Sequence, residues 1–249
     1  MSRIVDACVF LGRSRYGGEL SPAHALSVAE TLGVDTVVGV TAVPPDRDLR
    51  SATRGLLQLA AVNTGPVRLA VLARIDPWEP DAVASATEAL EQGAVGLFLN
   101  PWEETFRVND HPLLDPLMRL LAALGRPVVV EAGHPWVSEP AQLADLAVRH
   151  PDVSVVGTRG GHMNMSGLSG QTALRALRAA PNLHVLTSGV YRQDWLADVV
   201  AQLGPDRLCY GSLAPLLEPR LEILRPKALP DAEARAAVLG GTASRLFAL

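Results

Sequence analysis

The chain has 249 residues, with a formal net charge of −4 and an isoelectric point of about 5.9. This acidic balance argues against non-specific binding to nucleic acid or to an anionic membrane surface. No apolar run is as long as a transmembrane helix, and Met1–Asp6 lacks the basic start and apolar core of a signal peptide. We therefore expect a cytoplasmic protein.

Hydrophobic residues make up 48% of the chain, but aromatic residues make up only 4%. Ala, Leu and Val must then build the core, as in parallel sheets that are covered by helices. The length fits one large α/β domain over residues 1–249 better than two small domains. Cys8 and Cys209 both fall within predicted strands, which favours reduced thiols over a disulfide framework.

Short apolar runs alternate with helix-patterned segments along the whole chain. The predicted strands are Ile4–Phe10, Thr36–Val40, Arg68–Ala73, Gly96–Leu99, Val128–Glu131, Val153–Val156, Leu183–Leu186 and Leu208–Tyr210. The predicted helices are Pro22–Leu32, Leu49–Ala61, Pro80–Gln92, Leu113–Leu124, Pro140–Arg149, Gly170–Arg178, Trp195–Gln202 and Asp231–Leu239. Eight strands that alternate with helices favour a single (β/α)8 TIM barrel over an open doubly wound sheet.

Glycine residues support the boundaries of several helices. Gly33, Gly93, Gly125 and Gly204 stand at or just after the end of a helical pattern. Glycine accepts the left-handed conformation that ends many helices. The proline-rich segment Leu216–Pro230 is expected to be a loop after the last strand.

The residues that follow the strands of a (β/α)8 barrel form its active site. In this sequence they predict a polar pocket that contains arginine. The candidates are Glu131, His134, His162 and Cys8 for catalysis, and Arg13, Arg74, Arg159, Tyr191 and Arg192 for substrate binding. Four other histidines have more ordinary positions and receive no role: His24, His111, His150 and His184.

Glu131 is the best candidate for a catalytic residue. A carboxylate at the end of a buried strand has its pKa raised by desolvation or lowered by a cation, and either state suits general acid–base catalysis. The alternative is a salt bridge to Arg159, Arg74 or Arg13, because ion pairs also perturb pKa values.

His134 and His162 lie in glycine-containing loops after strands, where each is either a pocket group or an anchor of its loop. Either one could serve Cys8 as the base that a thiol nucleophile needs. Arg159, beside two glycines, is one of the arginines that could bind a carboxylate or phosphate group. We therefore expect a small anionic ligand, although each arginine is otherwise a surface ion pair.

Five segments stand in the order and at the approximate spacing of a known set of barrel motifs. They are Ile4–Gly12, Gly125–Gly133, His150–Gly161, Asp206–Pro215 and Leu239–Phe247. Together they resemble the amidohydrolase superfamily, in its compact branch of lactonases and metal-dependent decarboxylases. The resemblance implies a TIM barrel of the amidohydrolase type with its site at the mouth.

The same resemblance implies that the metal ligands of the family are replaced. The side chains in their places are Cys8, Phe10, Glu131, Thr158 and Leu213. Phe10 and Leu213 offer no donor atom, and zinc needs at least three converging ligands. We therefore expect no metal and no other cofactor. A rebuilt metal site would have to use Cys8 and Glu131 with a loop histidine.

Two functions remain open at this point. The first is a metal-independent hydrolase or lyase for a small carboxylated or carbonyl substrate, with Glu131 and a histidine as acid–base groups and arginines as an anion clamp. The second is a catalytically inactive protein that binds a ligand or serves as a partner subunit, in a homo-oligomer or beside an active homologue. The polar groups retained at the predicted mouth favour the first.

Overall fold

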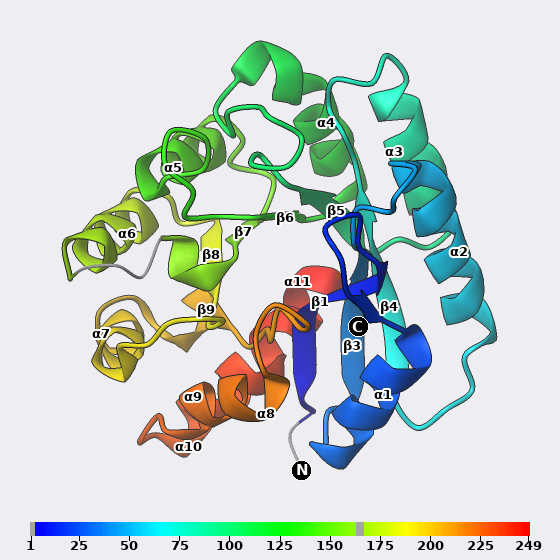
Figure 1. Ribbon diagram of the computed structural model, residues 1–249. Helices are drawn as coiled ribbons and strands as arrows, with labels where there is room; N and C mark the ends of the chain where they lie inside the picture. Colours follow the sequence, from blue (N-terminus) through cyan, green and yellow to red (C-terminus); the bar gives the residue numbers. More distant parts are fainter. Residues whose placement is uncertain (1–2, 163–166) are drawn as a thin grey trace.

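A curled, mainly parallel sheet forms the centre of the structure, a computed structural model that describes residues 3–162 and 167–249 (Figure 1). Its strands are β1 (Val5–Arg13), β2 (Glu19–Leu20), β3 (Thr36–Thr41), β4 (Arg68–Arg74), β5 (Gly96–Leu99), β6 (Val128–Val130), β7 (Val155–Gly157), β8 (Leu183–Leu186) and β9 (Leu208–Cys209). The nine strands lie in the order β2-β1-β3-β4-β5-β6-β7-β8-β9. Each neighbouring pair is parallel except β1 and β2, which are antiparallel.

Helices follow the strands and surround the sheet (Figure 1). They are α1 (Pro22–Thr31), α2 (Leu49–Val62), α3 (Ala82–Glu91), α4 (His111–Leu124), α5 (Pro140–Arg149), α6 (Gly167–Ala179), α7 (Gln193–Leu203), α8 (Pro219–Glu222), α9 (Leu224–Lys227), α10 (Ala232–Ala236) and α11 (Thr242–Phe247). Within the described ranges, no helix is both long enough and apolar enough to cross a membrane.

The predicted α/β class is confirmed, and a strand is present at each of the predicted strand positions. The prediction that Leu216–Pro230 is a loop is wrong, because α8 and α9 lie within it. Helices of 4 residues are too short to show a period of 3.6 residues in the sequence. The helix-ending glycines all have positive φ, and Gly125 (φ 60°, ψ 37°) ends α4 in the left-handed conformation.

Hydrophobic side chains form two cores, one on each face of the sheet. Leu97 of β5 belongs to the outer core and packs with helix residues such as Leu143 of α5. The next residue, Phe98, belongs to the inner core, which also contains Val129 of β6 and Phe247 of α11. Successive residues of a strand point to opposite faces, so one short apolar run supplies both cores.

Backbone hydrogen bonds join β1 to the segment that follows β9. The pairs are Ala7 N–H to Tyr210 O (3.0 Å), Leu213 N–H to Cys8 O (3.0 Å) and Phe10 N–H to Ala214 O (2.8 Å). The side chain of Asp6 adds a fourth link, because its Oδ1 accepts a bond from the backbone N–H of Ser212 at 2.7 Å. The first and last parts of the curled sheet therefore lie side by side.

Candidate active site

The carboxyl ends of the strands carry polar side chains above the inner core. In β4, Leu72 lies in the inner core and Arg74 comes two residues later. The same step leads from Val129 of β6 to Glu131. Side chains two residues apart share a face of a strand, so the apolar interior passes into a polar mouth.

A cavity of about 360 Å³ opens at this mouth. Four of the predicted site residues line it: Arg74, Glu131, His134 and Arg159. The lining formed by the described residues does not include the other five: Cys8, His162, Arg13, Tyr191 and Arg192. The cavity also contains Trp102 and Glu103, from the loop between β5 and α4.

Glu131 is almost fully buried, with 3% of its surface exposed, and is surrounded by donors. Its Oε1 accepts a bond from Nε of Arg159 at 2.9 Å, and its Oε2 accepts one from the hydroxyl of Thr158 at 3.1 Å. Nε2 of His134 lies 3.7 Å from Oε1. Burial raises the pKa of Glu131, but the contact with His134 and the charge and hydrogen bond of Arg159 outweigh it and lower this pKa below its usual value. Glu131 is therefore an ionised carboxylate at neutral pH.

His134 lies beside this carboxylate, and both side chains line the cavity. Its ring stacks on that of Trp102, with ring centres 5.1 Å apart and an angle of 13° between the planes. Its backbone N–H donates to the hydroxyl of Ser138 at 3.3 Å. The imidazole is 24% exposed. A histidine that is positioned by a buried carboxylate and an aromatic ring can exchange a proton with a ligand in the cavity.

Arg74 is held by two carboxylates from the loop after β5. Its Nη2 bonds to Glu104 Oε1 at 2.7 Å and also to Glu103. Burial raises the pKa of Glu104 to about 7, although Arg74 opposes this shift. Oε2 of Glu104 has no hydrogen-bond partner in the described parts of the chain. Glu104 could not be identified from the sequence, because it follows no strand directly and belongs to no recognisable motif.

Several residues with a strained backbone conformation also lie in the loops at this end of the sheet. Five described residues other than glycine have positive φ there: Arg47 (63°), Thr105 (55°), Trp136 (66°), Arg159 (55°) and Leu213 (54°). Such conformations are uncommon for residues with a Cβ and occur often at functional sites, where the surrounding structure imposes them. Arg159 thus reaches Glu131 from a strained backbone position.

The structure places two predicted catalytic residues behind the mouth. Cys8 is fully buried in the inner core, and burial, with the negative charges of Glu131 and Asp6, raises its pKa well above the usual value. A thiol in this state is a poor nucleophile. His162 is also buried, with its ring edge-to-face on Trp195 and its Nδ1 3.3 Å from the hydroxyl of Ser169.

Three predicted substrate-binding residues lie on the surface. Arg13, at the end of β1, is exposed. Arg192 is exposed and paired with Asp194. Tyr191 is 66% exposed, and its ring lies under the guanidinium of Arg225 at 5.1 Å. The structure therefore does not bring these three together with Glu131.

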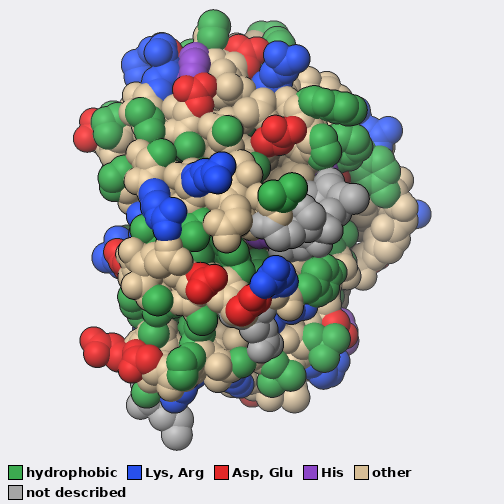
Figure 2. Space-filling view, turned by 90° about the vertical axis from the view of Figure 1, so that its left-hand side faces the viewer, with side chains coloured by type: hydrophobic (Ala, Val, Ile, Leu, Met, Phe, Trp, Pro, Cys, Tyr) green, Lys and Arg blue, Asp and Glu red, His purple; other side chains and the backbone are tan. Residues whose placement is uncertain are grey.

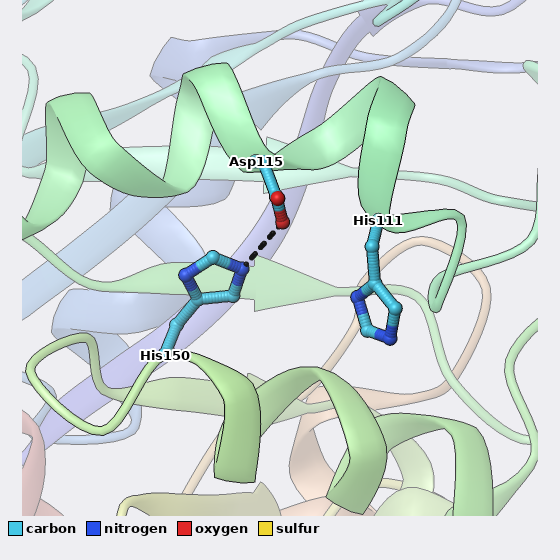
Figure 3. Close-up of side chains that lie close together, drawn as sticks. All are labelled: His111, Asp115 and His150. Carbon is cyan, nitrogen blue, oxygen red and sulfur yellow. Dashed lines mark hydrogen bonds and ion pairs between the residues drawn. The ribbon is translucent and has the colours of Figure 1, made fainter.

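One group of side chains in residues 3–162 and 167–249 could hold a metal ion (Figure 3). None of its members lines the mouth cavity. The group consists of His111 and Asp115 on α4 and His150 after α5, with one ligand atom from each lying within 4.8 Å of the others. The expectation that this chain lacks a metal site is therefore not supported. At the mouth, the same part of the chain provides no comparable group: Cys8 is a buried neutral thiol, and Glu131 is occupied by its partners.

A curled parallel sheet with polar side chains at the carboxyl ends of its strands defines an α/β protein of the TIM-barrel kind. The chain belongs to the amidohydrolase family, because the family model described as Amidohydrolase matches residues 14–249. Among curated proteins, no significant match to the sequence is found.

Solved structures of similar fold cover almost the whole chain. The 2,6-dihydroxybenzoate decarboxylase from Rhizobium is 16% identical, with a TM-score of 0.78 over 100% of this chain and 99% of that one. An uncharacterized TIM-barrel protein from Bordetella bronchiseptica is 18% identical, with a TM-score of 0.77 over 99% and 98%. A putative 2-pyrone-4,6-dicarboxylic acid hydrolase from Pseudomonas putida is 20% identical, with a TM-score of 0.72 over 100% and 98%. At these identities the likeness establishes the fold alone.

Proposed function

We propose that the mouth cavity is the active site of a metal-independent hydrolase or lyase for a small carboxylated or carbonyl substrate. The observation that carries the proposal is the pair of Glu131 and His134 beside an open cavity of about 360 Å³. Proteins of similar fold are named as a decarboxylase of an aromatic acid and a putative hydrolase of a dicarboxylic acid. Their names support a carboxylated substrate for this chain as well.

In the hydrolytic form of the reaction, His134 accepts a proton from water while the water oxygen attacks the carbonyl carbon. The carbon–oxygen bond to the leaving group then breaks, and the imidazolium returns the proton to the departing oxygen. Glu131 stabilises the imidazolium through its negative charge and fixes the ring. Arg159 lines the same cavity and is the candidate for binding the substrate carboxylate.

We also propose that the curled sheet closes into a (β/α)8 barrel. Support comes from the three backbone hydrogen bonds between β1 and residues 210–214, with lengths from 2.8 to 3.0 Å. Closure would seal the inner core laterally and leave the mouth as the route to Glu131.

The test is a screen for turnover of carboxylated lactones, small esters and aromatic carboxylic acids. It is run in the presence of a metal chelator that leaves the protein folded. We expect turnover that Glu131→Gln and His134→Asn each reduce about a hundredfold or more. His24→Asn, which removes an exposed imidazole on α1, serves as the matched control and should leave the rate unchanged. Loss of turnover in chelator, or unchanged turnover in both mouth variants, would refute the proposal.

A second candidate function is a non-catalytic protein that binds a ligand or serves as a partner subunit. It is favoured by the exposed aromatic side chains Trp102 and Trp136 in the loops around the mouth. The face over α5, α6 and α7 gives this second candidate less support, because the hydrophobic side chains on it are interspersed with charged ones (Figure 2). Saturable binding of a carboxylate without turnover, or a stable complex with a second chain, would support this candidate instead.

A further inference from the structure

His111, Asp115 and His150 come together where α4 and α5 lie side by side (Figure 3). His111 is the first residue of α4, and Asp115 lies one turn later on the same face. His150 directly follows α5. The lining of the mouth cavity includes none of the three, so this cluster is separate from the proposed active site.

His111 is oriented as metal-binding histidines usually are. Its Nε2 lies 3.2 Å from a carboxylate oxygen of Asp145, which fixes the ring as an Nε2 donor. Nδ1 then carries the lone pair. This atom is buried and has no hydrogen-bond partner in residues 3–162 and 167–249, and the ring edge that bears it faces the other two side chains in Figure 3. A carboxylate on one ring nitrogen and a metal on the other is the common arrangement for a histidine ligand.

Asp115 and His150 complete the set of ligands. Nε2 of His150 lies 3.0 Å from Oδ1 of Asp115, a separation close to that of two ligands on one tetrahedral metal ion. Movement of His111 by rotation of its side chain would bring its Nδ1 into the same sphere, since all three ligand atoms already lie within 4.8 Å. Two imidazoles and one carboxylate suit zinc and the neighbouring first-row metals better than magnesium or calcium.

The guanidinium of Arg149 occupies part of the space beside Asp115 that a metal ion would take. It donates to both oxygens of Asp115, at 3.0 and 2.6 Å. The arginine side chain is 48% exposed and can therefore move into solvent. A divalent ion would replace a single positive charge with a double one beside Asp115. Arg149 is thus a competitor of the metal and not a ligand.

We propose that His111, Asp115 and His150 bind a divalent first-row transition-metal ion, with Zn²⁺ as the best fit, and that this ion fastens α4 to α5. A water molecule would fill the fourth position. Both helices follow loops that carry mouth residues, Trp102 and Glu103 before α4 and Glu131 and His134 before α5. The site would brace these loops from outside. It does not depend on the proposed activity.

The test is a titration of the metal-free full chain with Zn²⁺ by calorimetry and with Co²⁺ by absorption spectroscopy. We expect one ion per chain and a Co²⁺ spectrum without a thiolate charge-transfer band. His111→Ala and His150→Ala should each weaken binding by at least the roughly 10- to 100-fold that loss of an outer partner costs. Arg149→Met should strengthen binding, because it removes the competitor.

Two mouth variants, Glu131→Gln and His134→Asn, are the matched controls and should leave the affinity unchanged. Circular dichroism establishes that each variant is folded. If His111→Ala fails to fold, the gain expected of Arg149→Met and anomalous diffraction at the zinc edge still decide. Absence of binding, a thiolate band, or an affinity that follows the mouth variants would overturn the proposal.

Discussion

Glu131 and Glu104 are buried to the same extent, with 3% of each residue exposed, yet their pKa values shift in opposite directions. Glu131 is contacted by Arg159, Thr158 and His134, which favour its charged form. Glu104 has one cationic partner, Arg74, and an oxygen with no partner within the described ranges. Two carboxyl groups whose environments separate their pKa values are typical of sites that use an acid and a base.

Glu104 should make the stability of the protein depend on pH near neutrality. Its pKa rises from the ordinary value of 4.5 to about 7 on folding, mainly through burial. The folded state then holds this proton more tightly, so the stabilisation is fully present below pH 4.5 and is lost as pH rises through 7. Relative to Glu104→Gln, the wild type should lose up to about 3 kcal/mol of unfolding free energy between pH 5 and pH 8.

The measurement is denaturant unfolding of both proteins at the two pH values. Other groups that titrate in this range, such as Asp6 with its pKa raised to about 6, are common to both proteins and cancel in the comparison. A difference between the proteins that is the same at both pH values would show that Glu104 does not titrate there.

For individual residues, the sequence predicts where a side chain lies better than it predicts which side chains contact it. The place of Glu131 after a strand follows from the two-residue period, and an ion pair with Arg159 was one of two open interpretations. The state of Cys8 is harder to predict, because its high pKa arises from burial and from the charge of Glu131, which is distant in the sequence, as well as from that of nearby Asp6. Tyr191 and Arg192 could not be placed, since they lie in the loop between β8 and α7 and loop conformation has no period that can be read.

Two polar side chains, those of Asn182 and Arg207, bind carbonyl groups at the carboxyl ends of helices. The amide nitrogen of Asn182 lies 2.7 to 3.0 Å from the carbonyl oxygens of Ala147, His150 and Val153, at the end of α5. The guanidinium of Arg207 donates to three carbonyls, those of Leu177 in the last turn of α6, Ala180 just after α6 and Leu183 at the start of β8. Each side chain satisfies acceptors that a helix end leaves without partners.

Replacement of Arg207 by methionine should destabilise the protein by about 3 kcal/mol, because buried carbonyl groups lose their donor and each such loss costs about 1 to 3 kcal/mol. Methionine retains the apolar contacts of the side-chain stem. The control is Arg178→Met, in the last turn of α6, the helix whose end Arg207 contacts. The side chain of Arg178 bonds to Gln202 at an exposed position. We therefore expect this substitution to change the unfolding free energy by less than about 0.5 kcal/mol. Urea unfolding measures both. Equal effects of the two substitutions would contradict a capping role for Arg207.

Elements that belong to the repeated alternation of strand and helix were predicted from the sequence, and short elements outside that alternation were not. β5 and β8 begin and end at the predicted residues. By contrast, β2 with 2 residues and the helices α8 and α9 carry no period. Their conformation depends on contacts made elsewhere, such as the bond from Gly189 N–H to Glu222 of α8 at 2.8 Å.

For the whole molecule, the alternation of strands and helices was enough to predict the arrangement of layers, because a parallel sheet needs a crossover helix after each strand. The cluster on α4 and α5 could not be predicted in this way. His111 and His150 lie far apart in the chain and follow no barrel strand, so the sequence gives no sign that their rings meet. Packing between neighbouring helices creates that contact.

Closure of the sheet is the property that involves the whole chain, since Asp6 and Ser212 are 206 positions apart. If the backbone bonds between β1 and residues 210–214 close a barrel, the amides of Ala7, Phe10 and Leu213 should exchange with solvent only when the whole molecule unfolds. In Asp6→Ala the N–H of Ser212 loses its buried acceptor. We expect these amides to exchange faster and the unfolding free energy to fall by about 2 kcal/mol.

Hydrogen exchange followed by mass spectrometry or NMR makes the measurement. Asp35→Ala is the matched control, because Asp35 also accepts a bond from a backbone N–H, that of Ile4 at 2.7 Å, but does so at an exposed position. It should leave the exchange of the closing amides unchanged. Wild-type exchange at Ala7 and Leu213 that is as fast as at a solvent-exposed strand edge would mean that the sheet is open. The inner core beneath Glu131 would then be reached from the side as well as through the mouth.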